Sequence, residues 1–131
     1  MGHRVNGMAF LAVGAGAALG AWLRWGLSGT LNHVFPNLPL GTLAANLIGG
    51  YLVGVAVEVL VHNSVLTPEW RLFIITGFLG GLTTFSSFSA EAVNLLSRQE
   101  YAWAGVLIGA HVVGSVILTL LGIATVRALS A

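Results

Sequence analysis

Four long apolar stretches fill most of this 131-residue chain, at residues 8–31, 40–61, 72–96 and 102–129. Each stretch reaches the roughly 20 residues that an α-helix needs to cross a hydrocarbon core of about 30 Å. Only 7% of the residues are charged, whereas soluble domains carry about 25%. The sequence therefore predicts an all-α membrane protein with four transmembrane helices, which form a single domain over residues 1–131. The short connections leave no room for a soluble catalytic domain.

The first apolar stretch has the position of a secretory signal peptide. It is too long for one, and Arg24-Trp25 near its end is typical of an interfacial anchor. We therefore expect this stretch to be a retained first span. The chain has no cysteine, which excludes disulfides and thiolate metal sites.

The arginines are spread almost evenly over the two sides of the predicted bundle. One side takes Arg4, Arg71 and Arg127, and the other takes Arg24 and Arg98. Membrane orientation follows an asymmetry in positive charge between the two sides, and three arginines against two make only a small asymmetry. Two interpretations stay open: insertion in both orientations, which permits an antiparallel dimer, or a weak orientation signal.

Each apolar stretch contains glycines spaced four apart. The pairs are Gly16/Gly20, Gly50/Gly54, Gly77/Gly81 and Gly105/Gly109. This spacing lets helix backbones approach closely in lipid. Four helices alone make a poor pore, so we expect an oligomer, most simply a dimer.

The third stretch contains polar residues where a simple span would have none. Gly80-Gly81 is followed by hydroxyl side chains at positions 83, 84, 86, 87 and 89. Glycine weakens a helix, and hydroxyls in hydrocarbon need partners. Non-helical backbone at membrane depth is tolerated where protein buries it or where it lines a cavity. The pattern predicts a broken third helix that handles something polar.

Polar residues also share faces of the second and fourth helices. Thr42 and Asn46 are four apart, as are His111, Ser115 and Thr119, and such positions stack on one helix face. A lone hydroxyl usually bonds the carbonyl four residues back. The Asn46 amide cannot satisfy itself so easily, which favours a functional or interhelical role.

The remaining polar side chains carry weaker signals. A single histidine such as His111 is more often a packing residue than a ligand. Glu58 and Glu91 are interpreted as interfacial or helix-terminal, and Arg24 is interpreted as a residue that snorkels or pairs at the membrane boundary.

Phe85 and Phe88 lie three apart among the hydroxyls. The edge of an aromatic ring carries partial positive charge, so an edge directed into a pore attracts an anion while it excludes water. Amide N–H groups, hydroxyls and ring edges together suit a small, largely dehydrated anion.

These motifs resemble the Fluc (CrcB) family of bacterial fluoride channels. The residues that carry the resemblance are the run 77–89, the Asn46 motif at residues 41–47, Arg24-Trp25 and Gly114-Ser115. The resemblance implies an antiparallel, dual-topology homodimer with two pores in the bacterial inner membrane. Such channels are not enzymes, and they let cytoplasmic fluoride leave passively and electrogenically.

The resemblance also implies roles for single residues. Phe85 and Phe88 match the pore phenylalanines, Asn46 matches an N–H donor to the ion, and Ser115 and Thr119 match a polar track in which His111 takes a variable position. A central structural sodium ion would be held by the carbonyls of Gly80 and Thr83 from both subunits, with Arg24 and Gly81 in structural roles. The implied partners are a second copy and the lipid bilayer, with no nucleic acid.

Three other classes of protein compete with this interpretation. A proton-coupled multidrug exporter needs a carboxylate deep in the first helix, and this chain has none there. A purely structural subunit would explain the glycine pairs but neither Asn46 nor the hydroxyl run. An intramembrane enzyme would need a serine–histidine–acid set or a metal cluster, and neither is evident.

Overall fold

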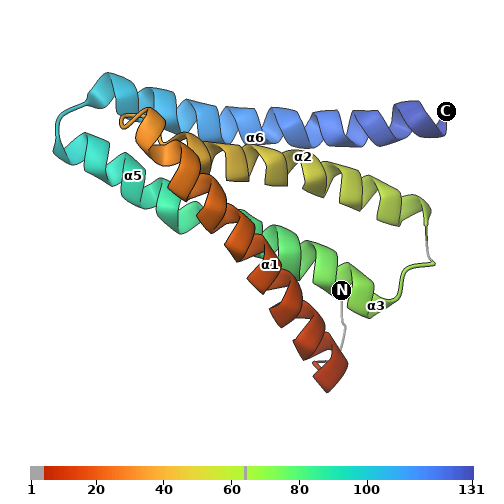
Figure 1. Ribbon diagram of the computed structural model, residues 1–131. Coiled ribbons are helices and arrows are strands. Elements are labelled where there is room, and N and C mark those ends of the chain that lie inside the picture. The colour runs from red at the N-terminus through yellow and green to blue at the C-terminus, as the bar shows by residue number, and fades with distance from the viewer. Residues whose placement is uncertain (1–4, 64) are drawn as a thin grey trace.

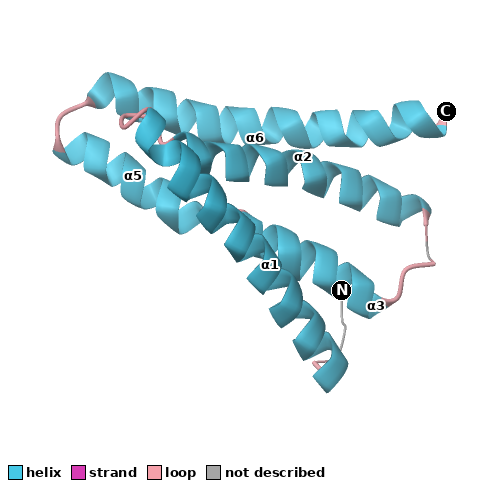
Figure 2. Ribbon diagram, viewed as in Figure 1, coloured by secondary structure: helices cyan, strands magenta, loops and turns pink. Residues whose placement is uncertain are grey.

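The computed structural model describes residues 5–63 and 65–131, and this part of the chain contains helices and turns but no strand (Figure 2). Four segments are long and apolar enough to cross a membrane: Gly7–Val34, Leu40–His62, Pro68–Ser97 and Tyr101–Ser130. They confirm the four predicted spans. The prediction for Arg4 lies outside the described residues.

The third span is divided into several helical pieces. The elements in chain order are α1 (Gly7–Leu31), the 3₁₀ turn η1 (Asn32–Val34), α2 (Leu40–His62), α3 (Pro68–Arg71), the π-helical η2 (Leu72–Leu79), α4 (Gly80–Leu82), α5 (Phe85–Ser97) and α6 (Tyr101–Ser130). The Thr67 hydroxyl accepts a hydrogen bond from the backbone N–H of Trp70 at 3.3 Å, with Pro68 in the first helical turn. Both residues therefore begin the third span as their sequence positions predict.

Two helix pairs make up most of the bundle (Figure 1). The long helices α2 and α6 pack along each other, and α1 packs across η2 and α4. From there α5 continues to one end of the molecule, where a short turn leads into α6. The third span thus contacts α1 with its first part and α6 with its last part.

Glycine sets how closely these helices approach. A Cβ atom on Gly16 would lie 2.8 Å from the backbone N of Phe78, and one on Gly77 would lie 2.8 Å from the carbonyl oxygen of Val13. Gly20 and Gly81 face backbone atoms across the same contact. The first and third glycine pairs therefore pack as predicted.

The glycine pair of the fourth span does not pack in this way. Apart from the neighbouring backbone of α6 itself, no atom of the described chain lies within 4 Å of a Cβ placed on Gly105 or Gly109. The close contact between α6 and α2 uses Gly122 and Gly54 instead. The expected packing role of Gly105/Gly109 is therefore wrong for contacts within one protomer, because α6 approaches α2 through a different stretch of its length.

Large apolar side chains cover the outside of the bundle. Examples are Phe10, Trp25, Val113, Val116 and Leu120, each more than half exposed. The buried apolar clusters are small, and one of them joins α5 to α6 around Phe88, Leu95 and Leu107. Apolar faces of this kind are stable against lipid, in agreement with four membrane-spanning segments.

Candidate functional site

Two residues with extended backbone lie in the middle of the third span. Helix α4 ends at Leu82, Thr83 has φ −85° and ψ 155°, and Thr84 has φ −147° and ψ 122°. The Thr84 hydroxyl then accepts the backbone N–H of Ser87 at 3.0 Å, which caps the start of α5. The threonine run therefore supplies both the extended residues and the side chain that restarts the helix.

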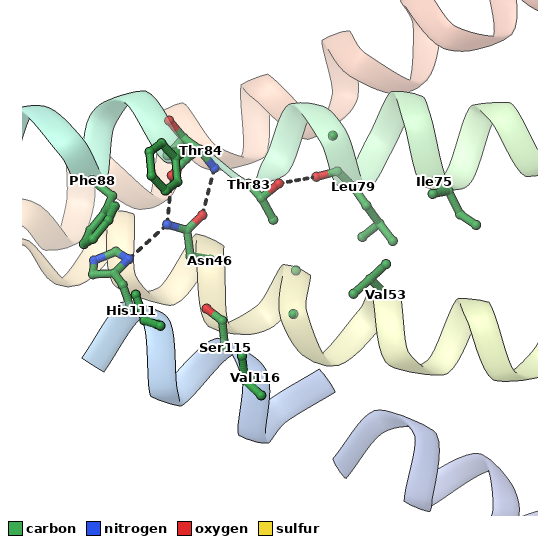
Figure 3. Close-up of a pocket in the computed structure, with 15 residues that line it drawn as sticks. Asn46, Val53, Ile75, Leu79, Thr83, Thr84, Phe88, His111, Ser115 and Val116 are labelled. Atoms are coloured by element: carbon green, nitrogen blue, oxygen red, sulfur yellow. Dashed lines mark hydrogen bonds between the residues drawn. The ribbon is translucent and has the colours of Figure 1, made fainter. Parts of the chain in front are cut away.

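Asn46 of α2 holds this extended backbone from the opposite side. Its Oδ1 accepts the N–H of Thr84 at 2.8 Å, and its Nδ2 donates to the carbonyl oxygen of Thr84 at 2.9 Å (Figure 3). The same Nδ2 lies 3.0 Å from Nδ1 of His111 on α6. Asn46 thus joins three spans at one point, which confirms its interhelical role.

Two carbonyl groups lose their usual helical partners here. In a continuous helix the N–H of Thr84 would bond the carbonyl of Gly80, but it bonds Asn46 instead. The carbonyl of Gly81 accepts a hydrogen bond from Nε of Arg24 at 3.1 Å. Arg24 therefore pairs with the backbone of the third span, which agrees with the pairing expected of it, and its position at the membrane boundary stays a prediction.

The two phenylalanines of the motif have different surroundings. The Phe88 ring is 8% exposed, and its centroid lies 4.7 Å from that of His111. Phe85 is 77% exposed and meets Phe88 edge to face, with centroids 5.6 Å apart. Phe88 therefore belongs to the packed interior, whereas Phe85 lies on an open face of the protomer.

These residues line an open groove of about 540 Å³ between α2, the third span and α6 (Figure 3). Its lining contains Asn46, Gly49, Gly50, Val53, Ile75, Leu79, Gly80, Thr83, Thr84, Phe85, Phe88, His111, Val112, Ser115 and Val116. The lining combines one amide, one imidazole, several hydroxyls and aromatic rings, with no acidic or strongly basic side chain in this described set. Such a surface suits a small polar or anionic species of low charge.

The groove includes most, but not all, of the candidate site residues. The Thr119 hydroxyl lies outside its lining and donates to the carbonyls of Gly50 at 2.8 Å and Ser115 at 2.9 Å. Gly81 packs against α1 on the far side of the third span. Asn46, Phe85, Phe88, His111 and Ser115 are brought together, with Gly80 and Thr83 beside them.

A second polar cluster next to this groove was missed by the sequence interpretation. The buried Thr42 hydroxyl donates to Oε2 of Glu91 at 2.6 Å, and Thr42 also bonds the amide of Asn32. Glu91 lies in the middle of α5, so the helix-terminal alternative is wrong, whereas the interfacial alternative stays a prediction. The four-residue spacing of Thr42 and Asn46 was the available signal, because it places both side chains on the same face of α2.

Glu58 keeps the position that the sequence predicts for it, in the last turns of α2. Its carboxylate accepts a hydrogen bond from Nε of Arg127 at 3.0 Å and contacts Nε2 of His62 at 3.1 Å. This ion pair joins the end of α2 to the end of α6.

Comparison with known proteins places this fold and groove in a family. Residues 11–123 match the family described as CrcB-like protein, Camphor Resistance (CrcB). A fluoride-specific ion channel FluC of Nitrosospira multiformis is 66% identical over 119 residues, which are 91% of this chain and 93% of the relative. The FluC of Nitrosomonas europaea is 60% identical over 88% of this chain and 91% of its own length. The FluC of Ralstonia pickettii is 59% identical over 96% of this chain and all of its own length. The chain is therefore a multi-pass membrane protein that belongs to the CrcB family, whose similar members are named fluoride-specific ion channels.

Proposed function

We propose that this chain conducts fluoride selectively across the membrane. The observation that carries the proposal is the groove, because its lining offers neutral hydrogen-bond donors and aromatic rings at membrane depth. The names of its relatives support the same ion. A neutral lining of this kind matches an anion that gives up its hydration shell in a narrow pore, since donors and pore diameter set selectivity there.

In the proposed pore, side chains replace the water around the ion. The ring edges of Phe85 and Phe88 present partial positive charge. The Ser115 hydroxyl forms a polar track with His111, and the Asn46 amide lies at its centre. Thr119, whose hydroxyl bonds the carbonyls of Gly50 and Ser115, extends this track beyond the groove lining. A larger, more weakly hydrogen-bonded halide such as chloride gains less from these groups and fits a narrow path less well.

We further infer that a second, inverted copy closes the groove. Phe85 is 77% exposed in one protomer, although its place in the proposed pore requires a wall on its open side. The nearly even arginine distribution permits insertion in both orientations. An antiparallel homodimer would place two such grooves between two copies and form two pores.

A structural sodium ion is part of the proposal. A hard cation prefers oxygen ligands, and the Gly80 carbonyl fits because its helical donor, the N–H of Thr84, is bonded to Asn46. The extended backbone of Thr83 turns a second carbonyl out of the helical pattern. Carbonyls of Gly80 and Thr83 from both copies would hold the ion, which would counter their partial negative charge and join the subunits.

The proposed location is the bacterial inner membrane. A passive pore there would let fluoride leave the cytoplasm down its electrochemical gradient, and each ion would carry one negative charge. This distinguishes the proposed channel from an exchanger, whose transport of fluoride requires a second ion.

Efflux from liposomes tests the proposal. Purified protein is reconstituted into vesicles loaded with equal potassium fluoride and potassium chloride, and both halides are followed with ion-selective electrodes. We expect fluoride to leave only after a potassium ionophore is added, while chloride stays inside. Equal chloride efflux, or fluoride efflux without the ionophore, would refute the proposal.

Matched variants separate the groove from the rest of the surface. Phe85→Ile and Phe88→Ile remove the ring edges. We expect fluoride efflux to fall at least about tenfold, because losing one interaction about as strong as a hydrogen bond slows a rate by roughly that factor. Phe10→Ile serves as the control, because Phe10 is 71% exposed on α1 and lies outside the groove. Unchanged efflux in both groove variants, with normal size-exclusion elution, would contradict the assigned path.

A further inference from the structure

The hydrogen bonds of Asn46 leave its amide with no free N–H group. An asparagine amide carries two N–H donors and one acceptor oxygen. Its Nδ2 lies 2.9 Å from the Thr84 carbonyl oxygen and 3.0 Å from Nδ1 of His111, so both donors are used. Asn46 could therefore offer an N–H to an anion only by breaking one of these bonds.

The backbone of Thr84 determines which way the amide faces. Its N–H is a fixed donor, 2.8 Å from Oδ1 of Asn46, and its carbonyl is a fixed acceptor, 2.9 Å from Nδ2. The reverse amide orientation would bring donor against donor and acceptor against acceptor. The group that faces His111 is therefore an N–H donor.

This orientation in turn determines the tautomer of His111. Nδ1 must accept the hydrogen bond from Asn46, so it carries no proton. A neutral imidazole keeps its single proton on the other ring nitrogen, and His111 is consequently the Nε2–H tautomer. The hydrogen bond from Asn46 thus determines which ring nitrogen of His111 carries the proton, as hydrogen bonds to histidine commonly do.

The Nε2–H group has no partner within the described part of the chain. His111 is 4% exposed, and its ring packs at 4.7 Å from Phe88, centroid to centroid. A buried donor without an acceptor is costly. The site therefore favours a small acceptor next to the Phe88–His111 pair, and both residues also line the groove.

We propose that His111 donates the hydrogen bond to the permeating fluoride through Nε2–H, and that Asn46 is a positioning residue which orients this ring. The inference rests on the proposed fluoride path and changes the role of Asn46 within it, since Asn46 was expected to donate to the ion itself. Fluoride is the strongest hydrogen-bond acceptor among the halides. An N–H donor held in apolar surroundings therefore binds fluoride in preference to the larger halides.

Nitrogen NMR tests the tautomer and the ligand separately. The chain has four histidines, and the ¹⁵N signals of His111 are assigned by their loss in His111→Gln. Without fluoride, we expect the shifts of a neutral Nε2–H ring in the reconstituted protein, and the opposite tautomer would overturn the inference. Added sodium fluoride, but not sodium chloride, should shift the Nε2 proton downfield. If the Nε2 proton does not respond to fluoride, this N–H group donates to water instead of the ion, and that result would also overturn the inference.

Two amide substitutions give a matched functional test. Gln reaches the position of Nε2 with an N–H donor, whereas Asn reaches only the position of Nδ1 and supplies an acceptor for Asn46. We expect fluoride efflux of His111→Gln to be about tenfold faster than that of His111→Asn, the factor that one hydrogen bond represents. Equal rates would overturn the inference. A wild-type protein that conducts no fluoride would instead refute the proposed function, and the tautomer measured without fluoride would still stand.

Discussion

Gly20→Ala is the sharpest test of how the third span is held. The added Cβ would lie 2.7 Å from the backbone N of Leu82 and 3.1 Å from the carbonyl carbon of Gly81, and it would meet the carbonyl oxygen of Phe78. All of these are backbone atoms, so no side chain can rotate away. Helix α1 must therefore move away from α4.

The size of the effect follows from two contributions. Overpacking a close contact costs about 1–3 kcal/mol. The same movement lengthens the hydrogen bond from Arg24 to the Gly81 carbonyl, now 3.1 Å, and a bond to a charged group contributes about 1.5–3 kcal/mol when it is lost completely. With partial loss of that bond, we expect a destabilisation of about 2–4 kcal/mol.

Gly14→Ala is the matched control on the same helix. Apart from the neighbouring backbone of α1 itself, no atom of the described chain lies within 4 Å of a Cβ at Gly14. Both variants gain the same helix propensity, about 1 kcal/mol, so their difference isolates the contact. The free energy of unfolding is measured by SDS titration in mild detergent at equal protein concentration, with fluorescence of the four tryptophans as the signal. Two variants that agree within about 0.5 kcal/mol would show that the contact of Gly20 with the third span is not tight.

Three further predictions use the same assays. Thr42→Val removes the hydroxyl that bonds Glu91 at 2.6 Å and should lower the free energy of unfolding by about 1–3 kcal/mol. Thr30→Val should have little effect, because the Thr30 hydroxyl is exposed and bonds its own helix. Equal effects of the two substitutions would contradict this prediction. Tyr51→Phe removes a 2.9 Å bond to Thr125 and should cost about 1 kcal/mol, and no loss would show that water replaces it. Exchange of sodium for N-methylglucamine throughout purification should lower fluoride efflux with helix content unchanged, and full efflux would contradict the proposed sodium site.

The spans and much of their packing could be predicted from the sequence. Length and hydropathy identify four helices because a bilayer requires about 20 apolar residues for each crossing. Glycine spacing correctly indicated the contact of α1 with the third span, since small residues allow close approach in lipid. Within one protomer it did not do so for Gly105 and Gly109, because spacing alone cannot tell which stretch of a helix faces its neighbour.

The bonding within the groove could be predicted only in part. The polarity of Asn46 indicated an interhelical role, but its partners Thr84 and His111 are 38 and 65 residues away in the chain. The pairing of Thr42 with Glu91, 49 residues apart, likewise depends on how the helices are arranged. Such contacts follow from tertiary packing, which local periodicity does not encode.

Silver block of single-cysteine variants tests most directly whether fluoride passes along the groove. The chain has no cysteine of its own, so Ser115→Cys places one thiol in the lining, and Val113→Cys places one on an outward face of α6 that is 56% exposed. Fluoride efflux is measured in nitrate buffer once thiol titration shows that silver has bound both. We expect silver to abolish efflux through the Ser115→Cys channel and to leave the Val113→Cys channel open. Undiminished efflux through silver-bound Ser115→Cys would contradict this expectation.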